Sequence, residues 1–174
     1  MIELVITAVG PDRLGLVDDL TGAVYGAGGN VADSRMVNLR GQFALLLLVE
    51  GLDEVADEVR RAVKRAGEEA GLSIAVSMQE HLAAAMEGGL PLRVRASAVD
   101  QPGLVHRITR VLHEMGVNIE QLTTVLQAAS YATPPVFNID MTVTAPAGVS
   151  VKRIREAIGL LCDELNCDVV IEPA

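Results

Sequence analysis

The segment DRLGLVDDLTGAVYGAGGN, residues 12–30, returns 88 positions later as DQPGLVHRITRVLHEMGVN, residues 100–118. The two copies share an Asp, a Gly-Leu-Val run, a Thr, a second Gly and an Asn at identical spacing. Beyond this segment the offset changes, because Phe43, Leu45, Leu47 and Val49 correspond to Phe137, Ile139, Met141 and Val143, which lie 94 positions later. One structural unit is therefore present twice, and the second copy is lengthened between 127 and 135.

Each copy shows the same order of hydrophobic periods. Alternation with period two predicts strands, and recurrence at helical spacing predicts two amphipathic helices, the first ending at Gly28 or Gly116. In the first copy the predicted strands are 2–8, 31–39, 42–50 and 72–79, and the helices are 16–27 and 55–66. In the second copy the strands are 92–98, 119–126, 136–144 and 168–172, and the helices are 104–115 and 154–165. The predicted class is α+β, with each copy a ferredoxin-like β-α-β-β-α-β unit whose antiparallel sheet is covered by helices on one face.

The repeat divides the chain into two domains, 1–80 and 91–174, and the Ala- and Gly-rich stretch 81–90 is the expected linker. The strand Phe43–Val49 is apolar on both faces, whereas its counterpart carries Asn138, Asp140 and Thr142 on one face. We therefore expect another domain or a subunit to cover the second face of the first copy's strand, and we expect a homodimer.

Composition excludes several classes of function. The 14 Lys and Arg against 23 Asp and Glu give a net charge of -9, which repels phosphate backbones, and the four aromatic residues offer little surface for stacking bases. Direct nucleic-acid binding is not expected. The two cysteines form neither a disulfide framework nor a zinc site, which fits a reducing cytoplasm. The longest apolar run, 43–49, is far shorter than a bilayer span, so membrane insertion is not expected.

Both copies place the sequence D-x-x-G-L where the first strand meets the first helix. A helix N-terminus has unpaired N–H groups and a partial positive charge, and a Gly there lets a ligand carboxylate approach the backbone. Asp12 or Asp100 can accept hydrogen bonds from an ammonium group, and Asn30 or Asn118 offers both a donor and an acceptor. Together these groups match the zwitterionic end of an amino acid. The alternative is structural: the Asp caps the helix, Pro102 begins it and the Asn follows a turn.

The motifs PDRLGLV at 11–17 and DQPGLV at 100–105, with GGNV at 28–31 and GVNI at 116–119, resemble the signature of ACT domains, which are small amino-acid-sensing modules. The resemblance covers nearly the whole chain as a tandem pair. More narrowly, VITAVGPDRLGLV at 5–17 and NVADSRMVNLRGQF at 30–43 are similar to the glycine cleavage system transcriptional repressor family, whose members are two ACT domains and little else.

This resemblance implies ligand sites at interfaces between ACT units, where the D-x-x-G turn of one unit faces strands of another. Leu14 replaces the Pro that is common in the motif and that Pro102 keeps, so we expect the second copy to hold the better-formed site. The expected ligand-binding residues are Asp12, Arg13, Leu14, Gly15, Leu16, Asn30, Asp100, Gln101, Pro102, Gly103, Leu104 and Asn118.

The resemblance also implies a regulatory protein, not an enzyme, that binds glycine or serine and contacts a DNA-binding transcriptional activator. The sequence assembles no catalytic triad or phosphate loop, and His106 and His113 lack partners at metal-ligand spacing, so no catalytic residue, cofactor or metal is expected. Three alternatives stay open. They are a regulatory subunit that gives a metabolic enzyme amino-acid feedback control, an enzyme with a site between subunits, and an RNA-binding module, which would need basic and aromatic strand faces.

Overall fold

The computed structural model describes residues 2–79, 89–128 and 134–174. The chain divides into two compact units, Met1–Ala83 and Ala84–Ala174. The expected linker 81–90 lies outside the described residues except for its last two positions, and Leu90 is already the first residue of a strand. The domain boundaries at 80 and 91 stay a prediction.

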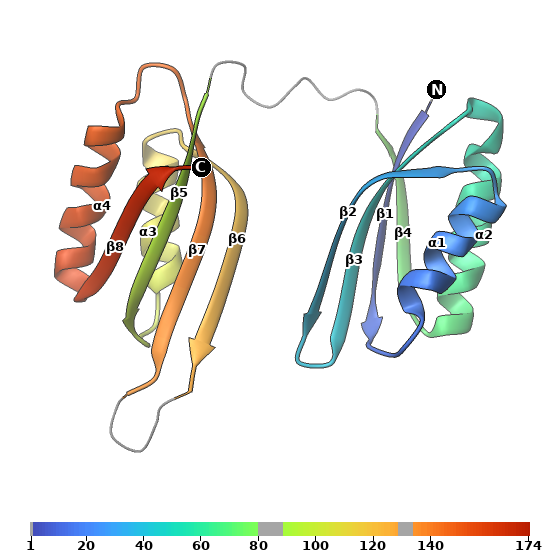
Figure 1. Ribbon diagram of the computed structural model, residues 1–174, viewed down its shortest axis with the longest axis horizontal. Coiled ribbons are helices and arrows are strands. Elements are labelled where there is room, and N and C mark those ends of the chain that lie inside the picture. The colour runs from blue at the N-terminus through green and yellow to red at the C-terminus, as the bar shows by residue number, and fades with distance from the viewer. Residues whose placement is uncertain (1, 80–88, 129–133) are drawn as a thin grey trace. The chain divides into compact units, whose positions relative to one another are not determined.

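Both units follow the predicted order β-α-β-β-α-β (Figure 1). The first unit consists of β1 Ile2–Pro11, α1 Leu16–Gly26, β2 Asn30–Leu39, β3 Gln42–Gly51, a short 3-10 turn Asp53–Val55, α2 Ala56–Ala70 and β4 Ser73–Gln79. The second consists of β5 Leu90–Val99, α3 Leu104–Glu114, β6 Asn118–Gln127, β7 Val136–Ala145, α4 Val151–Leu165 and β8 Cys167–Pro173. The sheets have the orders β2-β3-β1-β4 and β6-β7-β5-β8, and all neighbouring strands are antiparallel.

In each unit two helices cover one face of the sheet (Figure 1). Alternate strand residues, such as Leu4 and Ile6 on β1, point toward the helices and are fully buried. The stripe Leu16, Leu20 and Val24 of α1 packs into the same core. In the second unit Leu104, Ile108 and Leu112 of α3 occupy the equivalent positions. Each unit therefore has its own core, and burial of these stripes supplies the main stabilising term.

The glycines that follow α1 and α3 have the predicted left-handed conformation, with φ of 83° at Gly28 and 70° at Gly116. The strands that follow also share an irregularity. The register of β2 shifts between Val31 and Asp33, and that of β6 shifts between Ile119 and Gln121. The duplication thus kept local backbone details as well as the order of the elements.

The uncovered faces of the two sheets differ in chemistry. In the first unit the central strands present Val5, Thr7, Val9, Ala44, Leu46 and Leu48, and Leu46 is 50% exposed. In the second unit the equivalent positions hold Arg93, Arg95, Ser97, Asn138, Asp140 and Thr142. The expected cover over the first unit's apolar face stays a prediction, because each unit is described by itself.

Ion pairs cross the uncovered face of the second sheet. Arg93 donates two hydrogen bonds to Asp140, at 2.9 and 2.6 Å, and Arg95 donates one to Glu172 at 2.7 Å. The Arg93 guanidinium holds the pKa of Asp140 below its usual range. These polar rows remain hydrated in water, unlike the apolar face of the first sheet. Within the three described ranges, no helix is long and apolar enough to cross a membrane.

Cys162 and Cys167 occupy different environments, although only four residues separate them. Cys162 lies in the buried stripe of α4 and is 1% exposed, whereas Cys167 begins β8 and is partly exposed. Burial raises the pKa of the Cys162 thiol to about 12, with the neighbouring Cys167 adding to the effect.

We expect iodoacetamide to modify Cys167 of the native protein at least tenfold faster than Cys162 at about pH 8. The thiolate is the reacting form, and with a pKa of about 12 the Cys162 thiol is almost wholly protonated at that pH. Mass spectrometry of peptides from native protein would measure both rates, and denatured protein, in which both thiols should react alike, is the control. Equal rates in the native protein would contradict the burial of Cys162.

Candidate functional site

The turn from first strand to first helix has the same backbone form in both units. Gly15 and Gly103 are the residues immediately before α1 and α3, and they have φ of 93° and 88°, in the left-handed region that strains other residues. Among the described residues, no side chain caps either helix. The capping part of the structural alternative is therefore wrong, because neither Asp12 nor Asp100 caps a helix and Pro102 lies two residues before α3 begins.

The left-handed conformation of these glycines explains the Gly of the D-x-x-G motif without a ligand. A glycine is required at these positions by backbone geometry alone, whether or not a ligand approaches. A Cβ at Gly103 would meet no atom of the described residues within 4 Å, so among these residues the space next to the turn is open. A substitution at Gly103 would strain the backbone and also fill this space. Variants of this glycine therefore cannot separate an effect on ligand binding from an effect on backbone conformation.

In the first unit Asp12 is tied to the β2–β3 hairpin. Its backbone N–H donates to the carbonyl of Gly41 at 2.9 Å, and its carboxylate accepts a hydrogen bond from the Asn38 side-chain amide. The oxygen of that amide in turn accepts from the Gly41 N–H at 3.1 Å. The hairpin is tight, with left-handed Arg40 and Gly41 at its tip, as two-residue hairpins require.

In the second unit only the backbone part of this arrangement is kept. The Asp100 N–H donates to the carbonyl of Pro135 at 3.1 Å, at the end of the longer β6–β7 connection, of which residues 129–133 lie outside the described ranges. Among the described residues the Asp100 carboxylate accepts no hydrogen bond, and the residue is exposed. The Asp12 carboxylate is thus engaged by the hairpin, whereas the described residues supply no such partner to the Asp100 carboxylate.

Two further residues of the predicted site, Arg13 and Gln101, also have structural partners. Arg13 spans the first turn, where it donates to the carbonyl of Leu14 at 3.1 Å and to the Asp19 carboxylate at 2.9 Å. Gln101 donates to the carbonyl of Leu165 at 2.9 Å and so joins the second turn to the C-terminus of α4. Gln101 therefore anchors the turn.

The hydrophobic members of the predicted set behave differently from one another. Leu16 and Leu104 are 2% and 3% exposed, so their side chains belong to the cores and only their backbone N–H groups can serve a ligand. Leu14 is 97% exposed and Pro102 is exposed, so both border the turn without contributing a polar group.

The structure does not bring Asp12 and Asn30 of one unit together, and the same holds for Asp100 and Asn118. Helix α1 runs back along the sheet, so Asn30 begins β2 beside Glu50, whereas Pro11 ends β1 beside Gln42. The intervening strand length is about 25 Å at 3.3 Å per residue. Within each unit the Asp and the Asn therefore lie at opposite ends of the sheet, and Asn118 donates to Glu120 at 2.7 Å.

The first turns of the two helices differ in charge. Asp18 and Asp19 lie in the first turn of α1, where they already interact with the positive helix end, whereas the first turn of α3 has no acidic residue. The second unit therefore offers the more favourable place for a carboxylate. The expectation that the second site is better formed stays a prediction.

Sequence reasoning missed Asn38, Gly41 and Pro135, which hold the turns from the hairpin side. The Arg40-Gly41 pair marks the tight hairpin, but nothing in the spacing shows that this hairpin meets Asp12, 26 residues before Asn38. Over the three described ranges, no group of three or more His, Cys, Asp or Glu residues could hold a metal ion.

Comparison with known proteins identifies the family. The ACT domain model matches residues 3–77, which is the first unit. The glycine cleavage system transcriptional repressor of Escherichia coli (strain K12) is 30% identical over 165 residues, covering 94% of this chain and 85% of that protein, and the repressor of Shigella flexneri matches equally. The chain belongs to the glycine cleavage system transcriptional repressor family. It is thus a regulatory ACT-domain protein, and its relatives in the family are regulators by name.

Solved structures share the fold of this family member over its full length. The crystal structure of an unknown protein from Galdieria sulphuraria superposes with a TM-score of 0.87 at 25% identity, covering 99% of this chain and 98% of the other. A second crystal structure, named provisionally as a glycine cleavage system transcriptional repressor, gives a TM-score of 0.73 at 23% identity, with 98% and 96% covered. The second likeness shows the tandem ACT fold alone.

We expect Asp12→Ala to lower the free energy of unfolding by about 1 kcal/mol, because it removes the acceptor of the Asn38 amide. Asp100→Ala should change it by less than about 0.5 kcal/mol, as surface substitutions usually do. Chemical denaturation of both variants would measure the difference. Equal losses would show that the two carboxylates play the same structural part, as helix caps would.

Proposed function

We propose that this family member senses a small amino acid, glycine or serine, and passes the signal to a DNA-binding transcriptional activator by protein–protein contact. Membership in the repressor family supports the regulatory role, and the name of the Escherichia coli relative points to glycine metabolism. The acidic composition supports action through a partner, because a chain of net charge -9 is poorly suited to hold DNA itself.

The observation that carries the proposal is the chemistry of the second turn. The first turn of α3 has no acidic residue, and the described residues neither cap its N-terminus with a side chain nor fill the space beside Gly103. The Asp100 carboxylate, two residues before Pro102, accepts no hydrogen bond from the described residues. An α-carboxylate can bind the free N–H groups of the helix, and the α-ammonium can donate to Asp100.

A small amino acid sets limits on how the sensor works. Glycine has about five heavy atoms, and at a ceiling of about 1.5 kcal/mol per atom its Kd is no tighter than micromolar. Such a site responds to an abundant metabolite. The amino acid can change partner binding only through different affinities for the free and partner-bound states. The exposed turn fits this requirement, because it is accessible to both ligand and partner.

Calorimetric titration should show saturable binding of glycine or serine, and glycinamide, which lacks the carboxylate, should bind much more weakly. Asp100→Ala should weaken binding about tenfold to a hundredfold, through the loss of a charge-assisted hydrogen bond of about 1.5 to 3 kcal/mol. Glu156→Ala, which removes an exposed carboxylate on α4, is the control and should bind normally. Unchanged affinity in Asp100→Ala would refute the proposed role of the second turn.

Affinity capture from cell extract, with and without glycine, should recover a transcription factor whose yield depends on the amino acid. The reason is linkage: if the amino acid changes partner affinity, the captured amount must change with its concentration. Recovery of a metabolic enzyme in its place would favour the alternative, a regulatory subunit that gives that enzyme feedback control.

A further inference from the structure

The two cysteines of the chain lie on either side of the left-handed residue that ends α4. Cys162 belongs to the last turn of the helix and is 1% exposed, Asn166 has a φ of 50°, and Cys167 begins β8. The Asn166 N–H donates to the carbonyls of Cys162 and Asp163, which closes the turn. The chain therefore folds back between the two thiols.

The first unit shows how close these two positions come. Gly67 and Leu72 lie 95 positions before the two cysteines, on either side of the left-handed Gly71 that ends α2. The Leu72 N–H donates to the Gly67 carbonyl at 2.8 Å, so residues five apart across this cap adjoin. Side chains at these two positions of a helix cap frequently touch. The first unit places a Gly and a Leu there, whereas the second places two thiols.

The two thiols also act on each other. Burial is the main cause that raises the pKa of Cys162 to about 12, and the charge of Cys167 and a side-chain hydrogen bond with it add to the rise. Such a bond brings the two sulfur atoms into contact. A disulfide requires Cα atoms about 4.4 to 6.8 Å apart, and two residues that are joined by a backbone hydrogen bond across a cap meet this requirement.

We propose that Cys162 and Cys167 form a reversible disulfide when the protein meets a hydroperoxide, and that this bond loosens the turn at Asp100. The Cys167 thiolate attacks the peroxide, an S–O bond forms as the O–O bond breaks, and the leaving hydroxide takes up the proton that Cys167 released. The Cys162 sulfur then attacks the Cys167 sulfenic acid, so that the S–S bond forms, the S–O bond breaks and water leaves with the proton of Cys162. Two thiols are oxidised and one peroxide is reduced to two waters, and a dithiol reverses the bond.

The different environments of the two cysteines suit the two steps. Cys167 is partly exposed and reacts first, whereas burial and a high pKa protect Cys162 from peroxide in solution. Contact then gives the Cys162 sulfur a high effective concentration toward its neighbour. The charge of Cys167, which adds to the high pKa of Cys162, is absent from the sulfenic acid. Transient disulfides of this kind occur in reducing compartments as redox sensors.

The cap that holds the two cysteines also anchors the turn at residues 99–103. Gln101 donates to the carbonyl of Leu165 at 2.9 Å, and Leu165 lies between the two cysteines in the sequence. Cys167 pairs with Ala98 in the sheet, so the end of α4 moves when the sulfurs close from contact to about 2.05 Å. This movement draws the Leu165 carbonyl away from Gln101. The resulting loss of amino-acid affinity rests on the proposed function.

Treatment of the native full chain with hydrogen peroxide tests the formation of the disulfide. Trypsin leaves both cysteines in one peptide, residues 156–174, because no Lys or Arg follows Arg155. After treatment this peptide should be lighter by two hydrogen atoms, and it should resist alkylation until dithiothreitol is added. Cys162→Ala should leave a sulfenic acid on Cys167, which dimedone traps, and Cys167→Ser should form neither product.

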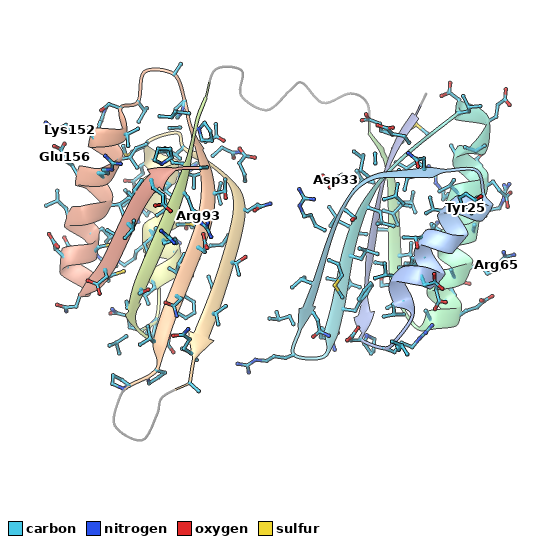
Figure 2. All side chains as sticks on the ribbon, in the orientation of Figure 1. Tyr25, Asp33, Arg65, Arg93, Lys152 and Glu156 are labelled. Atoms are coloured by element: carbon cyan, nitrogen blue, oxygen red, sulfur yellow. The ribbon has the colours of Figure 1, made fainter. Side chains whose placement is uncertain are left out.

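Amide hydrogen exchange of the reduced and oxidised protein tests the loosening of the turn without a ligand. The Asp100 N–H, which donates to the Pro135 carbonyl at 3.1 Å, should exchange at least about threefold faster after oxidation. The N–H of Glu156, which pairs with Lys152 on the N-terminal half of α4, is the internal control and should be unchanged (Figure 2). The double variant Cys162→Ala/Cys167→Ser has no thiol but keeps the six methionines, so it shows the effect of methionine oxidation alone.

Three results would overturn the proposal. They are a peptide 156–174 that peroxide leaves unchanged, a disulfide that joins two copies of the chain, and an Asp100 amide that exchanges equally in the reduced and oxidised protein. Glycine should bind the oxidised protein at least about threefold more weakly, and dithiothreitol should restore its affinity. Failure of glycine to bind the reduced protein would refute the proposed function alone, because neither the peptide mass nor the exchange rate depends on a ligand.

Discussion

Burial of two helical stripes against one face of a four-stranded sheet is the interaction on which each unit depends. A unit of about 80 residues buries a smaller share of its surface on folding than a large domain does, so nearly every position that faces the core must be apolar. The described residues meet this demand, since none of the fully buried ones is polar or charged. The outward positions are then free to change, and they are where the two copies differ in chemistry.

The duplication separates structural requirements from functional ones. Both copies keep a left-handed glycine before the first helix, a glycine turn after it and a shifted register in the next strand. These features follow from backbone geometry, so their repetition says little about ligands. The sheet face changes from Leu46 to Asp140, and the helix face changes from Tyr25 to His113. Functions that differ between the units belong on these variable faces.

Asp12 and Asp100 occupy the same position of the motif but make different side-chain contacts. Both use their backbone N–H to hold a hairpin carbonyl. Asp12 also uses its carboxylate on Asn38, whereas the carboxylate of Asp100 lies beside an uncapped helix that has no acidic first turn. The longer β6–β7 connection removes the tight Arg40-Gly41 hairpin that gives Asp12 its partner. An insertion in a loop thus changes the chemistry available at a turn far away in sequence.

The sequence by itself determined the α+β class, the element order and the inward stripes, because periods of two and 3.6 residues state directly which side chains face a core. It also determined which positions correspond, since duplication preserved the spacing. Only the tertiary structure decided that Asp12 and Asn30 lie at opposite ends of a sheet, that Gln101 holds α4, and that Asn38 reaches Asp12. These facts depend on chain direction and on contacts between residues 26 or more positions apart, which local periodicity does not encode.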